Sequence, residues 1–447
     1  MKMRSKTGLL FFLLQLCCGL LFFGQGSSQV PLDLQEALRL AKQNNLKLKQ
    51  QQAGEQVARL QELVQKAQRL PSLDFSATSS YVSEINEIDL SKTIGIQNRR
   101  VALGGHDRSE LMLGLQQPIF TGFRLESQVD LAKNASMSEE LKFDILANEI
   151  YHQVYLVFYQ AQDLYNSQRI LETSLKRLQI QLQQVRNLFD AAQVMAFDTL
   201  QVYNQALSVK IELADNRLAT KLTNLQMARL LDLPRVRPIA EVHLARPAGV
   251  VTPLQDLEAQ ALSMRPELKS VRLAQQAALI QQKLVRSSYF PNIFASANFH
   301  YAKPGLDPVA NSWMDYYSVG VKLQWNLWRW KGDQKKVQTF QVHYNRLTLE
   351  ERELLRTVEY EVEESFEKLQ FSLQELELAE ELQAQQEERY RIVSVQHRNG
   401  IASTNDLVTA ETDLTRAALQ THRATIKYYI FLANLKKAVG TIAQLQQ

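Results

Sequence analysis

The sequence predicts an α+β membrane protein built from two internal repeats, each combining long helices with a pair of β-strands. Residues 407–438 carry apolar or small side chains at alternating spacings of three and four, the heptad pattern of a helix packed along partner helices. The same alternation occurs 208 positions earlier, which indicates a repeat. After Pro71 and after Pro291 the period changes to two, which is typical of strands with one apolar face.

Composition narrows the class of protein. The chain has 447 residues and few glycines or prolines, as long exposed helices require. Its formal net charge is +4, and removal of a segment holding Lys2, Arg4 and Lys6 leaves about +1, so we expect no nucleic-acid partner. The two cysteines, Cys17 and Cys18, lie in the same segment. We therefore expect neither a disulfide framework nor a cysteine zinc site.

The N-terminus is predicted to be a secretory signal peptide covering residues 1–28. Basic side chains precede an apolar run over residues 8–23, and small residues suitable for cleavage follow near 26–28. A transmembrane anchor is the alternative, but a run of about 16 residues is short for a spanning helix. A lipid anchor on Cys17 or Cys18 is a second alternative, disfavoured because the three residues before them are not small.

Each repeat is expected to contain the same elements in the same order. In the first repeat, 29–240, we expect helices over 32–70 with an interruption at Asn44-Asn45, strands over 72–82 and 110–120, a long helix over 123–190 and a return helix over 197–232. In the second, 254–447, we expect a helix over 254–290, strands over 292–302 and 316–327, a long helix over 331–398 and a return helix over 404–440. Residues 241–253 form the connector.

The long helices set the shape. At about 1.5 Å per residue each would be about 100 Å long, too long for a globule, so they must pack side by side in an elongated bundle. The offset between repeats falls from 220 before the strands to 208 after them. The loop of the first hairpin is therefore 12 residues longer, and we expect residues 84–110 to form a surface loop facing outward.

Aromatic side chains gather near the ends of the predicted strands, and all four tryptophans belong to the second hairpin. Tryptophan and tyrosine are enriched at membrane interfaces because their rings are apolar in the body and polar at the edge. We therefore predict membrane-interface aromatics at Tyr81, Tyr301, Tyr317, Trp313, Trp325 and Trp328. A soluble sandwich with a buried aromatic core is the alternative.

Four strands with an apolar outer face cannot close by themselves. In lipid, each exposed backbone group on a strand edge costs several kcal/mol. Strands from more than one chain must therefore combine, and because small bacterial barrels have eight strands, a dimer or a trimer would suffice.

In these features the chain resembles the TolC-type outer-membrane factors, the exit ducts of efflux pumps and type I secretion systems. The resemblance covers essentially the whole mature chain and rests on the order and spacing of four segments. These are the opening helix at 34–41, Leu-Pro-Ser-Leu at 70–73, the strand exit at 117–122 and the tip from Asn-Gly-Ile at 399–401 to Asp-Leu at 406–407.

The resemblance implies a homotrimer in the outer membrane of a Gram-negative bacterium. Its twelve strands, four per protomer, would form a transmembrane β-barrel continuous with a long α-helical coiled-coil barrel that extends into the periplasm. The implied partners are outer-membrane lipid, a periplasmic adaptor (membrane fusion) protein and an inner-membrane transporter of the RND or ABC type. No cofactor is implied.

The resemblance also implies a gate where helical hairpins curl inward at the periplasmic tips. Asp406 matches the first gate aspartate, Asp198 takes its place in the first repeat, and Thr409 stands where a second aspartate often occurs. Ala402 stands where some members carry a basic residue that ties the gate shut, so this chain departs from a salt-bridge lock. Three aspartates around one axis would attract cations, and desolvation would raise their pKa. Helix capping is the alternative role for both aspartates, and the two roles can coexist.

The hairpin tips are the predicted docking surface for the adaptor. The residues concerned are Asn399, Gly400, Ile401, Ala402 and Ser403 at one tip and Val194, Met195 and Ala196 at the other. In the first repeat Ala192-Gln193 replaces the usual Gly-Leu. Ordinary turn packing is the alternative interpretation.

The predicted function is passive conduction through an outer-membrane exit duct, with energy and cargo choice supplied by the inner-membrane pump. An enzyme is not expected, because the seven histidines are scattered without metal-ligand spacing and no phosphate loop or nucleophile elbow is present. A secreted periplasmic coiled-coil scaffold without a pore is the alternative. It explains the helices but not the segments with a period of two.

Overall fold

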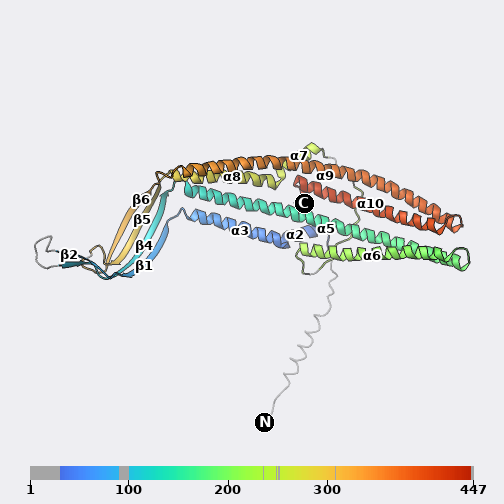
Figure 1. Ribbon diagram of the computed structural model, residues 1–447, viewed down its shortest axis with the longest axis horizontal. Helices are drawn as coiled ribbons and strands as arrows, with labels where there is room; N and C mark the ends of the chain where they lie inside the picture. The colour runs from blue at the N-terminus through green and yellow to red at the C-terminus, as the bar shows by residue number, and fades with distance from the viewer. Residues whose placement is uncertain are drawn as a thin grey trace, which may run out of the picture.

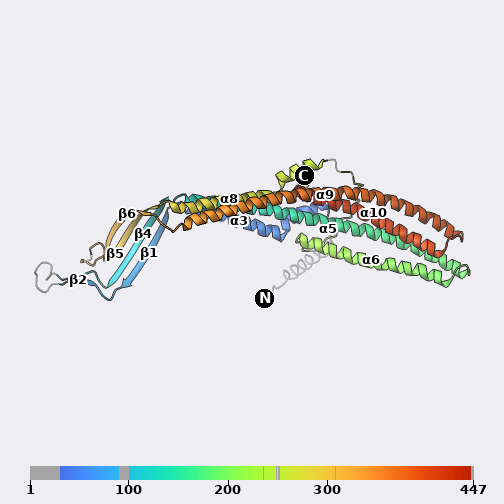
Figure 2. The same cartoon turned by 45° about the horizontal axis from the view of Figure 1, so that its top comes forward.

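The protein is an elongated rod with a β-sheet at one end and two helical hairpins at the other (Figures 1 and 2). The computed structural model describes residues 31–89, 100–234, 236–247, 249, 252–307 and 309–443. The predicted signal peptide lies outside the described residues.

The two repeats contain matching elements. The first consists of α2 (Leu34–Asn44), α3 (Leu46–Ala67), β1 (Ser72–Tyr81), β4 (Asp107–Phe120), α5 (Arg124–Asp190) and α6 (Ala196–Leu230). The second consists of α7 (Leu254–Met264), α8 (Pro266–Arg286), the short 3-10 helix η1 (Ser287–Tyr289), β5 (Asn292–Lys303), β6 (Met314–Gln324), α9 (Gly332–Arg398) and α10 (Thr404–Val439). The loop expected over 84–110 contains a small ribbon of β2 (Asn86–Asp89) and β3 (Arg100–Leu103), which the sequence did not indicate.

The opening helix of each repeat is broken into two. In the first repeat the break falls at Asn45, whose side chain accepts a hydrogen bond from the N–H of Lys47 at 2.9 Å and so caps α3. In the second it falls at Arg265, because the residue before a proline avoids the helical conformation while Pro266 suits the first position of α8. The first break was expected from Asn44-Asn45, and the second was not.

The four long strands form one antiparallel sheet in the order β1-β4-β5-β6, so the two repeats meet between β4 and β5. Residues with apolar side chains pair across all four strands, as in the row Phe75, Leu113, Phe299 and Tyr317. These side chains are exposed, with Phe75 at 68% and Tyr317 at 82%. The neighbouring row is Asp74, Gly114, Asn298 and Ser318, so the sheet has one apolar and one largely polar face. The apolar face is uncovered, unlike the buried core of a sandwich.

Five of the six predicted aromatic residues lie at two levels of the sheet. Tyr81 stacks on His106, and Tyr301 stacks on Trp313 with ring centroids 4.8 Å apart, at the end away from the long helices. Trp325 and Trp328 lie at the other end, beyond the last residue of β6, although the sequence placed them near or inside a strand reaching 327. The exposed Tyr317 lies in the apolar row between the two levels.

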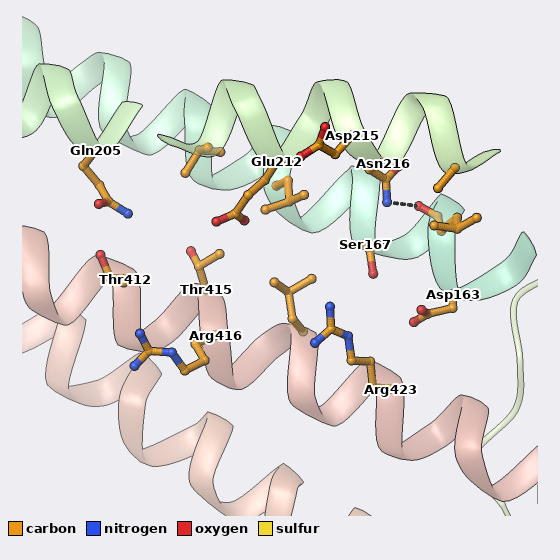
Figure 3. A pocket seen from close by; sticks show the side chains of 15 residues that line it. Asp163, Ser167, Gln205, Glu212, Asp215, Asn216, Thr412, Thr415, Arg416 and Arg423 are labelled. Carbon is orange, nitrogen blue, oxygen red and sulfur yellow. Dashed lines mark hydrogen bonds between the residues drawn. The ribbon is translucent and has the colours of Figure 1, made fainter. Parts of the chain in front are cut away.

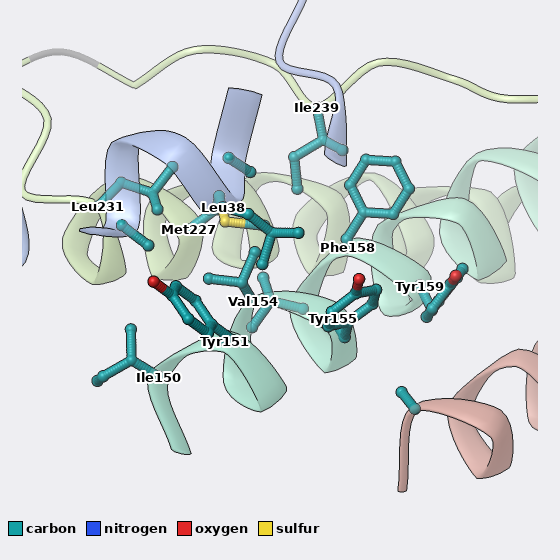
Figure 4. Packing of buried hydrophobic residues seen from close by; sticks show 14 of the residues in the cluster. Leu38, Ile150, Tyr151, Val154, Tyr155, Phe158, Tyr159, Met227, Leu231 and Ile239 are labelled. Atoms are coloured by element: carbon teal, nitrogen blue, oxygen red, sulfur yellow. The ribbon is translucent and has the colours of Figure 1, made fainter. Parts of the chain in front are cut away.

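Helix α5 is the central element of the rod. It packs against α3, α6, α8 and α10, and its middle third is lined by the aromatic side chains of Tyr151, Tyr155, Phe158 and Tyr159. Figure 4 shows these rings with Leu38, Met227, Leu231 and Ile239 from three other segments. The main hydrophobic core therefore lies at mid-length, where the opening helix and the return helix meet α5. The connector, which in the structure is the whole segment between α6 and α7, joins them there.

A buried glutamine holds the connector against this core. Gln162 of α5 is fully buried, and its Nε2 donates to the carbonyl of Ala240 at 2.7 Å. Its Oε1 accepts from the N–H of Val242 at 2.8 Å. Leu32 pairs with Ile239 in an isolated parallel bridge beside it. One side chain thus satisfies two backbone groups of a segment that has no regular structure of its own.

We expect Gln162→Ala to release the connector. The substitution leaves two backbone groups without their partner, which costs about 2 kcal/mol and raises the open population roughly 30-fold. Chymotrypsin should then cleave after Leu244 correspondingly faster, as followed by mass spectrometry of the fragments. Gln168→Ala is the control, because the half-buried Gln168 bonds only within α5. Equal cleavage rates in the two variants would show that the connector is held by other contacts.

Candidate functional site at the helical tips

The two hairpin tips have the same backbone turn. Ala192, between α5 and α6, has φ +57°, and Gly400, between α9 and α10, has φ +72°. The residues that follow, Gln193 and Ile401, each donate an N–H to a carbonyl five residues back, at 2.9 Å in both turns. This is the hydrogen bond of a Schellman motif, which favours glycine at the left-handed position. The alanine therefore keeps the turn despite the steric cost of its Cβ, about 1 kcal/mol.

Both predicted gate aspartates cap the helix that follows the turn. The Oδ2 atom of Asp406 accepts hydrogen bonds from the hydroxyl of Ser403 at 2.7 Å and from its N–H at 3.1 Å. The Oδ2 atom of Asp198 accepts from the N–H of Met195 at 2.9 Å. The Ser403 side chain, more than its backbone N–H, holds the pKa of Asp406 below its usual range. The carboxylate of Asp406 is thus both ionised near neutral pH and exposed at the end of the rod.

Besides the two aspartates, the predicted tip residues include both apolar and polar side chains. Met195 and Ile401 are the exposed apolar side chains of their turns, at 77% and 75%. Thr409 is exposed on α10, three residues after Asp406, and Ala402 is half-buried. The remaining predicted tip residues, Asn399, Gly400, Ser403, Val194 and Ala196, lie in the same two turns.

The two tips are joined side by side. Gln201 of α6 donates its Nε2 hydrogen to Oδ1 of Asn405 on α10. His397, near the end of α9, is buried and lies 3.4 Å from the hydroxyl of Thr404. Burial lowers the pKa of His397, and the negative charge of Asp198 on the other hairpin opposes that shift. His397 was missed from the sequence because its neighbour Asp198 lies in the other repeat.

Above the tips, a buried carboxylate ties the two hairpins together. Glu411 of α10 is fully buried, and its Oε1 accepts from Ser174 at 2.7 Å, from Arg177 at 2.9 Å and from Thr415 at 2.9 Å. The guanidinium of Arg177 also lies over the ring of Tyr390, 5.8 Å from its centroid. These five residues, the Glu411 cluster, link α5 to α9 and α10.

The Glu411 cluster was not anticipated, although one signal for Glu411 was available. It stands four residues after Leu407 and three before Leu414, on the apolar side of the heptad pattern. An acid at such a position is buried when the helix packs, and it then requires a paired charge.

An open cavity of about 540 Å³ separates the first hairpin from α10 beside this cluster (Figure 3). Its charged lining consists of Asp163, Glu212, Asp215, Arg416 and Arg423. Asp163 also lies 3.5 Å from Nε2 of His422. Burial raises the pKa of Asp163 and lowers the pKa of His422, and the charge of each group opposes the shift of the other.

Two kinds of feature are absent from the described ranges. Among these residues, no group of three or more His, Cys, Asp or Glu side chains is arranged to hold a metal ion. Nor does any helix that the structure describes have the length and apolar character needed to cross a membrane.

Comparison with protein families identifies the fold. The model of the outer membrane efflux protein family matches residues 37–232 and 257–441, one match for each repeat. The chain belongs to the outer membrane efflux protein family. A comparison with curated protein sequences gives no significant match.

Solved structures of outer-membrane proteins have a similar fold. The Campylobacter jejuni CmeC outer membrane channel is 14% identical and superposes with a TM-score of 0.77, covering 91% of this chain and 85% of CmeC. VceC of Vibrio cholerae is 17% identical with a TM-score of 0.75, covering 91% and 96%. The open state of the Neisseria gonorrhoeae MtrE channel is 16% identical with a TM-score of 0.73, covering 91% and 88%.

Family membership confirms several predictions made from the sequence. This efflux-family chain is an outer-membrane channel protein of a Gram-negative bacterium, with helices that extend into the periplasm. The two-repeat, TolC-like organisation is confirmed as well. Members of the family are channels of efflux pumps, which work with adaptors and inner-membrane transporters.

We expect Glu411→Gln to loosen the contact between the hairpins of this efflux-family protein. Neutralising the carboxylate leaves the partly buried Arg177 without its anion, at a cost of about 3 kcal/mol. Amide hydrogen exchange in α5 and α10 around residues 174–181 and 407–415 should then accelerate roughly 100-fold.

The control is Glu387→Gln, which changes an exposed glutamate of α9. Adding Arg177→Met to Glu411→Gln should restore part of the protection, because the second change removes the unpaired charge. If Glu411→Gln exchanged no faster than the control, the Glu411 cluster would not hold the hairpins together.

Proposed function

We propose that the protein is the trimeric exit duct of a tripartite efflux pump or type I secretion system. It conducts substrates passively across the periplasm and the outer membrane and is gated at the helical tips. The observation that carries this proposal is the four-stranded sheet with an exposed apolar face and two free edges.

The free edges complement each other. Within the described part of the chain, β1 pairs only with β4 and β6 only with β5. Because the sheet is antiparallel throughout and has an even number of strands, β1 and β6 run in opposite directions and can pair between copies. Two copies would give an eight-stranded barrel, and the interior of such a barrel is filled by side chains. Three copies give twelve strands and leave room for a conduit.

The two helices at the edges of the bundle also have exposed apolar surfaces. Between mid-length and the hairpin tips the helices lie side by side in the order α6-α5-α10-α9, so α6 and α9 are at the two outer edges. Each edge helix has a second, exposed apolar stripe at helical spacing. The stripe on α6 comprises Phe197, Leu200, Leu207, Ile211, Leu218, Leu222 and Leu225, and that on α9 comprises Phe371, Leu378, Leu382, Ile392 and Val395. Packing of α6 on α9 of the next copy would bury both stripes and close a tube.

The tips supply the gate in this proposal. Three copies of the ionised Asp406 around the axis would attract cations and raise a barrier to anions, with Asp198 contributing from the other hairpin. Capping requires one carboxylate oxygen of each aspartate, Oδ2, which leaves the other available to the pore. The exposed Met195 and Ile401 are suited to docking an adaptor from the periplasmic end. A periplasmic scaffold would leave the apolar sheet face without a partner.

Cross-linking tests the trimer. The two cysteines of the chain are at 17 and 18, in the predicted signal peptide, so introduced cysteines are the reactive ones in the mature protein. With Ser76→Cys on β1 and Ser318→Cys on β6, a short bis-maleimide should give bands of two and three chains on denaturing gels. Each single-cysteine variant is the control, because equivalent positions lie across the barrel. Single-chain bands alone in the double variant would rule out the pairing of β1 with β6.

Single-channel recording in planar bilayers tests the gate. Asp406→Asn should lower the preference for potassium over chloride at least about threefold and weaken block by divalent cations, because three charges leave the narrowest ring. Adding Asp198→Asn should lower the preference further. Asp256→Asn, in α7 at mid-length, is the control with the same change in charge. Unchanged selectivity would contradict the assignment of Asp406 to the gate. A lack of any conductance would contradict the proposal that the protein is a duct.

A further inference from the structure

The contact between the two repeats of one chain provides a template for a contact between two copies. α9 is the counterpart of α5, and α10 is the counterpart of α6, at an offset of 208 residues. α8 is the counterpart of α3 at an offset of 220. Within the chain, α5 packs against α8 and α10. The equivalent contact for α9 is therefore with α3 and α6, which lie at the opposite edge and can be supplied only by another copy.

The exposed stripe on α6 matches the side of α10 that faces α5. Ile426 and Ala433 of α10 are buried in the main core with α5, and Ile430 packs against the same core. Their counterparts on α6 are large apolar side chains that are exposed: Leu218, Leu225 and Leu222. The same helical positions thus have a partner helix in the second repeat and no cover in the first, among the residues that the structure describes.

The positions of α5 that reach α10 also have exposed counterparts. Three polar side chains of α5 contact α10: His152, Asp163 and Ser174. The counterparts of these three on α9 are apolar or aromatic and exposed: Tyr360, Phe371 and Leu382. The contact is polar inside the chain, whereas the template pairs two apolar stripes between copies. Burial of both stripes would stabilise that contact.

The charges on the two edges agree with the same register. Tyr159 of α5 stacks on Tyr429 of α10, with ring centroids 5.4 Å apart. Their counterparts are Glu367 on α9 and Lys221 on α6, so the template brings opposite charges together. Both side chains are exposed, and neither forms an ion pair within the described part of the chain.

A groove of about 810 Å³ lies at mid-length on the α6 edge. α3 and α6 follow one another along this edge, and residues of α5 form the floor of the groove between them (Figure 1). Lys47 and Arg229 line it, and their counterparts Glu267 and Lys437 line a cavity of about 300 Å³ in the second repeat. One wall of that smaller cavity is α5 itself. The groove is therefore the equivalent space, with its side away from α5 left open.

We propose that α9 of one copy packs on α6 and α3 of the next copy in the register of the internal contact, with Tyr360 entering the mid-length groove. Tyr360 takes the place of His152, whose Nε2 lies 2.6 Å from Oδ1 of Asn434. The counterpart of Asn434 is Gln226, which lines the groove. Glu367 lies against Lys221. This inference rests on the proposed trimer and adds the residues that fix the height of one copy against the next.

Cross-linking at the proposed ion pair tests the register. With Glu367→Cys and Lys221→Cys in one chain, a short bis-maleimide should give bands of two and three chains on denaturing gels. α6 and α9 lie at opposite edges of the chain, so this link cannot form within one copy. Glu367→Cys with Lys210→Cys is the matched control, because Lys210 is exposed on the same helix 11 residues, or about 16 Å, away.

Exchange of the charges tests the same pair without cysteines. Glu367→Lys should weaken association of the three chains about tenfold, as followed by native mass spectrometry during dilution in detergent. An attractive pair then becomes a repulsive pair at each of three interfaces. Adding Lys221→Glu should restore association, which damage to folding would not allow. Glu387→Lys makes the same change in charge on the opposite side of α9 and should have no effect.

The contrary results separate this contact from the trimer itself. More cross-linking in the control pair than in the proposed pair would show that the copies meet in another register. Trimers in native mass spectrometry that give no link between positions 367 and 221 would overturn the contact and leave the trimer in place. Single chains in both measurements would overturn the proposed trimer, and this contact with it.

Discussion

The need to satisfy backbone hydrogen bonds at the two edges of the sheet is the constraint on which the rest of the structure depends. One chain provides four strands with a continuous apolar face, and β1 and β6 each have one side without a partner among the described residues. In lipid those groups would have no water to bond, which is the physical basis of the proposed pairing between copies of the chain. The exposed apolar stripes on α6 and α9 extend this constraint to the helices, because they too have no cover within one chain among the described residues.

This constraint explains why the hydrophobic core of a single chain is thin and lies at mid-length. Tyr151 to Tyr159 of α5 face the opening helix, the return helix and the connector, while much of the sheet and of α6 and α9 remains uncovered. Gln162 adds hydrogen bonds to the packing of Ile239 and so secures the connector, which has no regular structure of its own. The core of one chain therefore stabilises mainly the middle of the rod, and in the proposed trimer the tube closes only when the copies assemble.

Polar groups lie both at the hairpin tips and at the contact between the two hairpins. At the tips, Asp198 and Asp406 complete the turns while exposing charge. Further up, the Glu411 cluster joins the two hairpins through a buried carboxylate. At its Oε1 atom Glu411 accepts hydrogen bonds from Ser174, Arg177 and Thr415, which offsets part of the cost of burying the carboxylate.

The sequence by itself determined the features that depend on near neighbours. The period-two segments after Pro71 and Pro291 predicted the two-faced strands, and Ser403 three residues before Asp406 predicted the capping box. Only the tertiary structure decided which distant residues meet. Arg177 reaches Glu411, and Asp198 acts on His397, across more than 190 residues, because contacts between hairpins depend on the axial stagger and rotation of helices about 67 residues long. A shift of one helical turn would pair different side chains while leaving every local pattern in the sequence unchanged.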